Sequence, residues 1–231
     1  MSTVLLFDLD GTLVNTGGAG RRAMNAAFLE LFGREDGFRD FKFDGMTDFA
    51  IARAGLKKHH GEEAAIDQAA IDAFLATYVG YLEAELPRSE KYVVLPGVAA
   101  LIASLANAPN VAVGLGTGNI KRGAYAKLVR SDLGGAFAFG GFGCDAEDRT
   151  ELLRVGAQRG AEQLGRPLAE CRVIVIGDTP KDIAAARGIG AACLAVATGG
   201  YTKDELRAHA PAHVAGSLEE EGVRELLLSR L

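Results

Sequence analysis

Residues 4–13 read VLLFDLDGTL, a short apolar run followed at once by two aspartates and a glycine. Such a run, ended by turn-forming residues, predicts a buried strand. Three later runs have the same character, at residues 111–115, 173–176 and 192–196. Helical patterns lie between them, at about 97–106, 121–131, 150–164 and 182–187. This alternation predicts an α/β fold of the Rossmann-like, doubly wound type, in which helices cover both faces of a parallel sheet.

One long segment breaks this alternation, because it carries helical patterns without a convincing strand. Its edges lie at the Gly17-Gly18 pair on one side and at the stretch from Pro87 to Pro96 on the other. Both edges are poor helix interiors, which predicts hinges there. We therefore expect two domains: a core of residues 1–15 and 89–231, and an inserted all-helical cap of residues 16–88.

The composition is that of an ordinary folded chain and argues against several classes of protein. The 231 residues are 48% hydrophobic, and their net charge of -5 gives no general attraction to nucleic acid or anionic membranes. Three cysteines without a C-x-x-C pair suggest neither a disulfide framework nor a zinc knuckle. No signal-peptide pattern precedes Asp8, and the longest uncharged stretch is too short for a membrane span. We expect a cytoplasmic protein without nucleic-acid or membrane partners, and leave its oligomeric state open.

Polar residues follow three of the predicted strands directly. Asp8 and Asp10 follow the first strand, Thr117 the second and Asp178 the third. Ligands of open α/β sheets bind at the carboxyl ends of the strands, so we expect these side chains to meet in one crevice. Each aspartate taken alone has a simpler interpretation as a turn or helix-cap residue.

Together, Asp8, Asp10, Asp178 and Asp182 would place four carboxylates around this crevice. Two such charges about 4 Å apart repel by roughly 4 kcal/mol at an effective dielectric constant of about 20. A fold tolerates that cluster when a cation or protonation relieves the repulsion. Because no histidine or cysteine lies near these segments, the oxygen ligands favour Mg²⁺, which commonly binds carboxylates together with a substrate phosphate.

At these residues the chain resembles the haloacid dehalogenase-like hydrolase superfamily. Residues 7–13, FDLDGTL, resemble its first motif, D-x-D-G-T. Thr117 follows an apolar strand as in the second motif, and residues 177–182, GDTPKD, resemble the G-D-x-x-x-D of the fourth. The resemblance extends over the whole chain. It puts the helical insert where that superfamily carries a C1 cap, between the first two motifs.

The resemblance implies roles in catalysis or phosphate binding for five residues. Asp8 would be the nucleophile that forms an aspartyl phosphate, and Asp10 would be the general acid and then the general base. Thr117, the backbone N–H of Gly118 and Asn119 would bind the transferring phosphoryl group.

The resemblance also implies that Mg²⁺ is the cofactor. The ion would be held by Asp8, by the main-chain carbonyl of Asp10 and by Asp178. Asp182 would be either a further ligand or a support behind the others.

The third motif departs from the family, which usually supplies a lysine there. Residues 145–150 read DAEDRT, and we assign the role to Arg149 because a guanidinium stays charged and can bridge a carboxylate and a phosphate. Lys121 and Lys127 are the rival candidates, on the helix predicted after the second motif. The simpler interpretation makes both lysines solvated helix charges.

The cap is expected to contact the substrate through residues 43–47, FDGMT, where Gly45, Met46 and Thr47 are the candidate binding residues. The alternative is a plain interhelical turn in which Thr47 caps the next helix. Arg21 and Arg22 could reach a substrate carboxylate, although exposed arginines at a helix start need no such role.

Within the superfamily, Asp10 argues against haloacid dehalogenases and phosphonoacetaldehyde hydrolases, which carry another residue there. β-Phosphoglucomutases share the aspartate pair, but they have a histidine shortly after the first motif, and residues 15–21 contain none. The chain is most similar to the phosphoglycolate phosphatase-like group. We expect a Mg²⁺-dependent phosphatase acting on a small phosphorylated metabolite, phosphoglycolate-like or a sugar phosphate. The alternatives are a β-phosphoglucomutase-like phosphotransferase and a catalytically idle phosphometabolite sensor.

Overall fold

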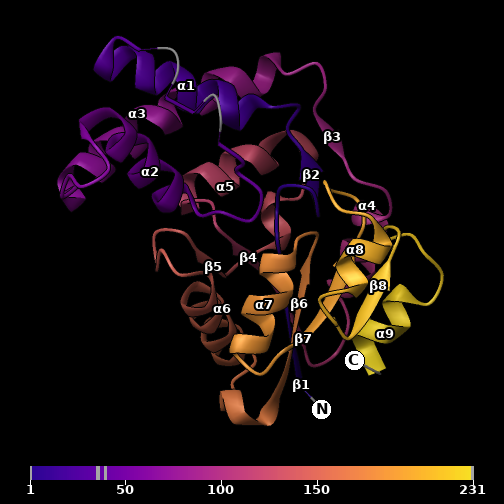
Figure 1. Ribbon diagram of the computed structural model, residues 1–231. Coiled ribbons are helices and arrows are strands. Elements are labelled where there is room, and N and C mark those ends of the chain that lie inside the picture. Colours follow the sequence, from indigo (N-terminus) through magenta and orange to yellow (C-terminus); the bar gives the residue numbers. More distant parts are fainter. Residues whose placement is uncertain (1, 35–36, 39–40, 230–231) are drawn as a thin grey trace.

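The computed structural model describes residues 2–34, 37–38 and 41–229 of the chain (Figure 1). Its centre is a parallel sheet of six strands. In spatial order they are β5 (Gly140–Phe142), β4 (Val111–Thr117), β1 (Ser2–Phe7), β6 (Cys171–Gly177), β7 (Ala192–Val196) and β8 (His213–Ala215). The first strand of the chain is therefore central, with β4 on one side and β6 on the other. The Rossmann-like fold predicted from the alternating pattern is confirmed.

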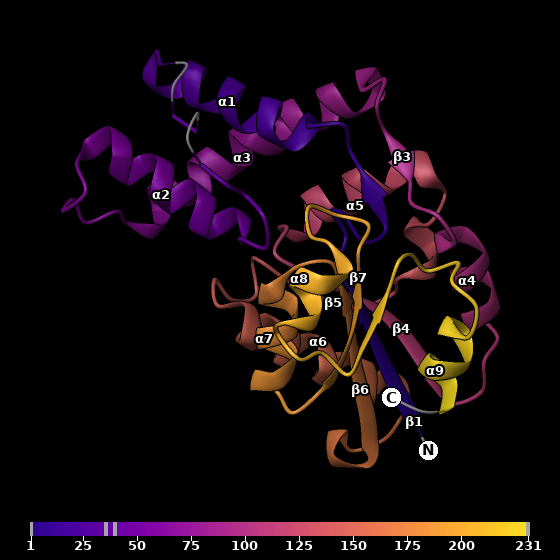
Figure 2. The same cartoon turned by 45° about the vertical axis from the view of Figure 1, so that its right-hand side comes forward.

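Helices cover both faces of this sheet (Figure 2). One face packs against α4 (Val98–Leu105), α5 (Lys121–Leu128) and α9 (Val223–Ser229). The other packs against α6 (Arg149–Gln163), α7 (Pro180–Gly188) and α8 (Lys203–Arg207). Along β1, Leu5 and Phe7 point to the first layer, and Val4 and Leu6 to the second. Because both faces are buried, the strand is apolar at every one of these positions.

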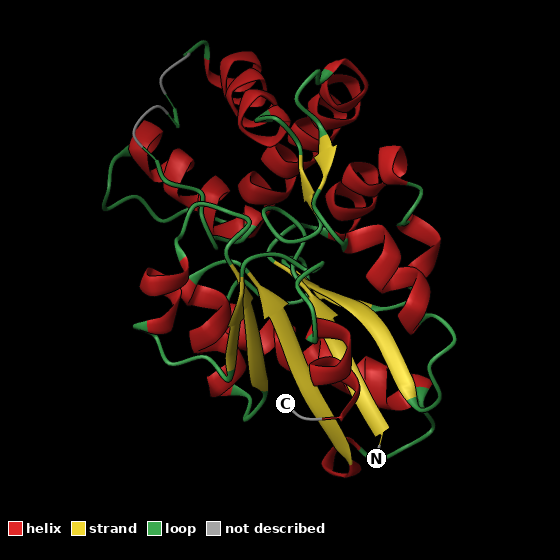
Figure 3. Cartoon of the chain, turned by 90° about the vertical axis from the view of Figure 1, so that its right-hand side faces the viewer, coloured by secondary structure: helices red, strands yellow, loops and turns green. Residues whose placement is uncertain are grey.

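The inserted segment forms a separate helical layer over the carboxyl end of the sheet (Figure 3). Its long helices are α1 (Ala19–Phe32), α2 (Asp48–His60) and α3 (Gln68–Glu85), followed by the short η1 (Leu86–Arg88). They share a hydrophobic core of their own, in which the Phe28 ring packs edge to face against Phe38 and Phe74, and the latter two rings are tilted relative to each other. The described residues of this segment contain no strand, so the expected all-helical cap is confirmed for them.

Two short strands connect the core with the cap. β2 (Val14–Asn15) leads out of the core and β3 (Val93–Val94) leads back, and the two pair antiparallel. Beside them, the Ser89 hydroxyl donates to the Thr16 carbonyl at 2.6 Å. The two crossings of the chain are thus fastened to each other. None of the helices described here has the length and apolar character that a membrane span requires.

Candidate active site

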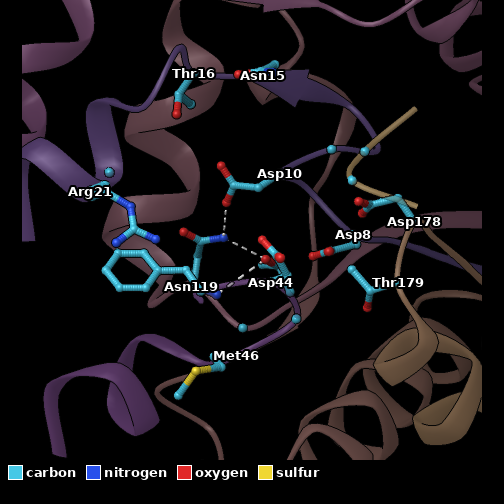
Figure 4. Close-up of a pocket in the computed structure, with 18 of the residues that line it drawn as sticks. Asp8, Asp10, Asn15, Thr16, Arg21, Asp44, Met46, Asn119, Asp178 and Thr179 are labelled. Carbon is cyan, nitrogen blue, oxygen red and sulfur yellow. Dashed lines mark hydrogen bonds between the residues drawn. The ribbon is translucent and has the colours of Figure 1, made fainter. Parts of the chain in front are cut away.

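The ends of three adjacent strands meet beneath the cap. Asp8 follows β1, Thr117 ends β4 and Asp178 follows β6. Because β1 lies between the other two strands, these side chains share one pocket of about 480 Å³, lined by the core and by the cap. In Figure 4 the carboxylates of Asp8 and Asp178 point into the same part of this pocket. The expected crevice at the carboxyl edge of the sheet is therefore present.

Glycines let two loops close on the Asp178 carboxylate. A Cβ on Gly11, which has a φ of +83°, would lie 2.4 Å from Asp178 Oδ2, and a Cβ on Gly199 would lie 1.7 Å from it. No side chain larger than hydrogen fits at either position. The Thr12 hydroxyl donates to Asp178 Oδ1 at 3.1 Å. The carboxylate is consequently fixed in one orientation beside the nucleophile candidate.

The carboxylates of Asp8, Asp178 and Asp182 lie close enough to hold a cation, with ligand oxygens within 4.8 Å of one another. Asp182 already accepts two bonds on each oxygen: from the N–H and hydroxyl of Thr179 on Oδ2, and from two guanidinium nitrogens of Arg149 on Oδ1. This favours a supporting position for Asp182. Asp8 and Asp178 offer hard oxygen ligands, and the described residues that line the pocket include no histidine or cysteine, so the donor set fits Mg²⁺.

Burial makes these carboxylates costly to ionise. It raises the pKa of Asp8 to about 6, against the favourable charge of Arg149, and raises the pKa of Asp178 to about 9, with Asp182 and Asp8 adding to the shift. A carboxyl group whose charged form is disfavoured keeps its proton until a cation replaces it. In the absence of a cation, burial therefore favours the protonated forms of Asp8 and Asp178.

Arg149 lies at the first position of α6, after Asp148 has capped that helix. Its guanidinium is buried and approaches Asp8 Oδ2 at 3.0 Å while it binds Asp182. Burial alone would lower its pKa, but the two carboxylates raise it above its usual range. The structure thus brings the residue chosen for the third motif into contact with the nucleophile candidate.

The two rival lysines differ sharply. Lys121 is exposed at the start of α5, with its ammonium 5.9 Å from the ring centre of Phe142. Lys127 is buried, and its Nζ lies 2.6 Å from Asp10 Oδ2 and 2.6 Å from Asn119 Oδ1. The interpretation as a solvated helix charge holds for Lys121 and is wrong for Lys127.

The residues after β4 form a connected group. Thr117 Oγ1 accepts bonds from the backbone N–H of Asn119 at 3.3 Å and from its side-chain amide at 2.8 Å. The same amide donates to Asp10 Oδ2 at 2.9 Å, the contact drawn in Figure 4. Gly118 lies against the cap, where an added Cβ would be 2.5 Å from the Met46 carbonyl oxygen. All three predicted phosphate-binding residues line the pocket.

The cap loop predicted to meet the substrate reaches the pocket with two of its three candidate residues. Gly45, at a φ of +61°, and Met46 line it, and a Cβ on Gly45 would lie 2.8 Å from Thr179 Oγ1. Thr47 instead caps α2 by accepting from Ala50 N at 3.2 Å, and it is not among the described residues that line the pocket. Thr47 thus has the capping role that was the alternative interpretation.

Among the further pocket residues that come from the cap are Asp48 and Tyr78, for which the sequence carries no signal. Asp48 is buried, accepts from Ile120 N at 2.9 Å and has a pKa raised to about 6 by burial. Tyr78, on α3, is buried with its pKa well above the usual range. An aspartate after a capping threonine and a tyrosine in an apolar helical pattern are ordinary helix features. Only the docking of the cap gives them a place in the pocket.

Comparisons with known proteins agree with this fold. A profile of haloacid dehalogenase-like hydrolases matches residues 3–190, whereas no curated protein matches the chain. A predicted phosphatase from Clostridium acetobutylicum is similar, with a TM-score of 0.70, 20% identity and 99% of each chain covered. CbbY from Rhodobacter sphaeroides, solved in complex with phosphate, has a TM-score of 0.69 at 20% identity, over 96% of this chain and 97% of that one.

A predicted phosphoglycolate phosphatase from Haemophilus somnus is also similar, with a TM-score of 0.66 and 16% identity over 94% of this chain and 95% of that chain. At such identities these structures establish the shared fold. The family profile is more specific, because it spans most of the chain, from the first strand through α7. The chain therefore belongs to the haloacid dehalogenase-like hydrolases, the superfamily that its strand-end motifs predict.

Proposed function

We propose that this hydrolase is a Mg²⁺-dependent phosphatase that cleaves the phosphate ester of a small metabolite through an aspartyl-phosphate intermediate. The observation that carries the proposal is the placement of two aspartates with different surroundings at one strand end. Asp8 is buried against Arg149, whereas Asp10 faces the pocket with 44% of its side chain exposed. Such a pair suits a nucleophile and a proton carrier.

In the first step, Asp8 attacks phosphorus and forms a new P–O bond. The bond between phosphorus and the ester oxygen breaks, its electron pair stays with that oxygen, and a proton from Asp10 converts it into an alcohol. Arg149, and the N–H groups of the loop that follows Thr117, stabilise the charge on the transferring phosphoryl group. Asp8 and Asp178 would hold Mg²⁺, which supplies further charge neutralisation at the phosphoryl oxygens when bound.

In the second step, Asp10 takes a proton from a water molecule, and the water oxygen attacks the phosphorus of the aspartyl phosphate. The bond from phosphorus to the Asp8 oxygen breaks, so the carboxylate and inorganic phosphate are released. Each turnover thus returns both aspartates to their starting states. The cap limits the access of bulk water to the pocket during the first step.

The cap residues that line the pocket favour a substrate of the phosphoglycolate type, which carries a second anionic group, over a sugar phosphate whose sugar is neutral. The Arg21 guanidinium lies 4.0 Å from the ring centre of Phe43 and donates to the carbonyls of Phe38 and Phe41. It lines the pocket, and none of the described residues gives it a carboxylate partner. A guanidinium held in this way is ready for a carboxylate.

The proposed reaction is tested by release of inorganic phosphate from 4-nitrophenyl phosphate, 2-phosphoglycolate and a hexose phosphate, with Mg²⁺ or with EDTA. We expect turnover that needs Mg²⁺ and disappears in Asp8→Asn, because the amide is not a nucleophile. A folded protein silent on the whole panel would contradict the proposal. Net transfer of phosphate between sugar positions, without release, would instead support the phosphotransferase alternative.

The substrate class is tested by comparing 2-phosphoglycolate with its neutral analogue, 2-hydroxyethyl phosphate. In Arg21→Met we expect the ratio of the two kcat/KM values to fall by about 10 to 100-fold, which is the loss of one charge-assisted pair. Arg22→Met is the matched control, because Arg22 pairs with Glu85 on the cap. An unchanged ratio of the two kcat/KM values in Arg21→Met would mean that Arg21 only stabilises the cap loop and does not bind the substrate.

A further inference from the structure

We propose that Lys127 is a positioning residue for Asp10: it holds one carboxylate oxygen so that the other exchanges the proton with the ester oxygen. The inference rests on the proposed function and adds a residue to it. Lys127 comes from the last turn of α5, a core helix, and belongs to none of the sequence motifs. Its side chain is 6% exposed, although its ammonium reaches the wall of an open pocket.

A buried ammonium group needs acceptors, because its transfer from water is strongly unfavourable without them. Lys127 Nζ has two, Asp10 Oδ2 and Asn119 Oδ1, each at 2.6 Å. The contact to Asp10 is a charge-assisted bond of the strong class. Lys127 is therefore held in the position from which it orients Asp10.

The three side chains form a closed ring of hydrogen bonds. Lys127 donates to Asp10 and to Asn119, and the Asn119 amide donates to Asp10 at 2.9 Å. Two hydrogen bonds fix the orientation of the Asn119 side-chain amide, because its nitrogen also donates to Thr117 Oγ1 at 2.8 Å. Lys127 and Asn119 both donate to the same oxygen of Asp10, Oδ2. Among the described residues no side chain donates to Oδ1, so Oδ1 is left to carry the transferable proton.

Cap groups close over this ring from three helices. On α1, a Cβ added to Gly20 would lie 3.7 Å from Lys127 Nζ and 3.8 Å from the Tyr78 hydroxyl of α3. On α2, Asp48 is close enough for the charge of Lys127 to lower its pKa against the larger effect of burial. The ring is thus complete where the cap meets the core. Arg149 acts elsewhere, on Asp8 and Asp182, so the two buried cations have separate tasks.

The chemistry of the first step gives this geometry a measurable consequence. When the P–O bond breaks, an alkoxide needs the proton from Asp10 Oδ1, whereas 4-nitrophenolate is a stable anion and needs it far less. Loss of an ordered Asp10 therefore slows an alkyl phosphate more than an aryl phosphate. A residue that only supports the fold would slow both esters alike.

The experiment compares Lys127→Ala and Lys127→Met with Lys121→Ala, which removes the same charge from an exposed position of the same helix. For Lys127→Ala we expect kcat on 2-hydroxyethyl phosphate to fall by about 10² and kcat on 4-nitrophenyl phosphate by less than about 10-fold, with KM nearly unchanged. Ethylamine added to Lys127→Ala should restore kcat on the alkyl ester, because the vacated space opens onto the pocket. Lys121→Ala should match the wild type.

Equal losses on both esters without rescue by ethylamine would overturn the inference, and so would a loss confined to KM. Lys127→Met keeps the volume of the stem, so it separates loss of the ammonium from loss of packing. If neither variant folds, as judged by circular dichroism, Lys127 is a structural residue and the inference fails. A wild type inactive on both esters marks failure of the proposed function itself.

Discussion

At the scale of single residues, Arg149 connects parts of the site that the sequence keeps far apart. Its planar guanidinium reaches Asp8 through one nitrogen while two nitrogens bind Asp182, more than thirty residues further along. A lysine ammonium is a compact charge and cannot present this fork. The departure from the family's usual lysine therefore ties Asp8, the proposed nucleophile, to the N-terminus of α7, where Asp182 completes a capping box with Thr179.

Replacing Arg149 should affect the rate far more than substrate binding. We expect Arg149→Ala to lower kcat by about 10² to 10³, because the charge that develops on the phosphoryl group loses one stabilising partner. Arg149→Lys should lose less, since the charge remains. Steady-state kinetics on 4-nitrophenyl phosphate measures both variants. A kcat in Arg149→Ala equal to that of the wild type would contradict the assigned role.

The raised pKa of Asp178 should make the stability of the metal-free protein depend on pH. Burial raises the pKa of this carboxyl group to about 9 in the folded state, whereas in the unfolded state it loses its proton near its ordinary pKa of 3.8. Between these values the folded state binds more protons, so the free energy of unfolding falls as the pH rises. Urea unfolding at pH 5, 7 and 9 in EDTA should show this decline.

Mg²⁺ should reduce that decline, because it takes the place of the proton on the folded protein and adds binding energy. Asp178→Asn is the control, since an amide does not titrate. If the free energy of unfolding of Asp178→Asn fell with pH as steeply as that of the wild type, other groups would cause the pH dependence. Asp8 has a pKa raised to about 6, so it also makes the free energy of unfolding fall as the pH rises, but only up to about pH 6.

Sequence alone predicts which strand-end residues meet, and it fails for helix residues that are buried only where the cap and the core dock. Asp8, Thr117 and Asp178 each end a buried strand, and adjacent strand ends share an edge. Lys127 and Asp48 lie on helices, where a charged residue is usually solvated. Their burial depends on how the cap docks against α5, a tertiary contact that local patterns do not contain.

At the scale of elements, the four strong apolar runs became β1, β4, β6 and β7, while four short strands carry no detectable pattern. β5 and β8 have three residues each, and β2 and β3 have two. A periodicity of two cannot be read from so few residues. Their pairing is imposed by neighbours: the long strands for β5 and β8, and the two chain crossings for β2 and β3.

The contact between the β4 loop and the cap loop should depend on the lack of a side chain at Gly118. In Gly118→Ala the new Cβ would lie 2.5 Å from the Met46 carbonyl oxygen and 2.9 Å from Thr47 Cα, so one of the two loops must shift. We expect kcat/KM to fall at least about 10-fold, because small displacements of substrate-positioning groups are costly. Phosphate release with 2-phosphoglycolate measures the loss.

Gly80→Ala provides the control for this prediction. Gly80 lies in α3 with nothing within 4 Å of the added Cβ, so the exchange should leave activity unchanged and stabilise the helix by roughly 0.5–1 kcal/mol. Equal activity in Gly118→Ala and Gly80→Ala would show that the loop contact does not matter for turnover.

At the scale of the whole molecule, two ion pairs among the described residues join the cap to the core. Arg53 of α2 binds Glu147 in front of α6 at 2.9 Å, and Arg122 of α5 binds Glu83 of α3 at 2.7 Å. All four side chains are at least one third exposed. Each pair is therefore weak in water, and salt weakens it further.

Removing both pairs should shift the cap toward an open arrangement. We expect the double variant Glu83→Gln with Glu147→Gln to raise KM by about two- to tenfold at low salt, the range that such exposed pairs permit. At about 0.5 M NaCl the difference from the wild type should largely disappear, because the charges are screened. Glu151→Gln is the control, since its pair with Arg154 lies within α6. A KM difference that persists in salt would contradict an electrostatic origin.

The paired strands β2 and β3 determine how the cap can move. A single linker would let the cap both bend and rotate about the axis of the linker. Here two linkers pair with each other at Val14–Val94 and Asn15–Val93, and this pairing resists the rotation. The two-stranded ribbon therefore acts as a hinge that bends easily in one direction only. We therefore expect opening and closing of the cap to follow one arc, which would bring Asp48, Tyr78 and Gly20 back to the same positions beside Lys127.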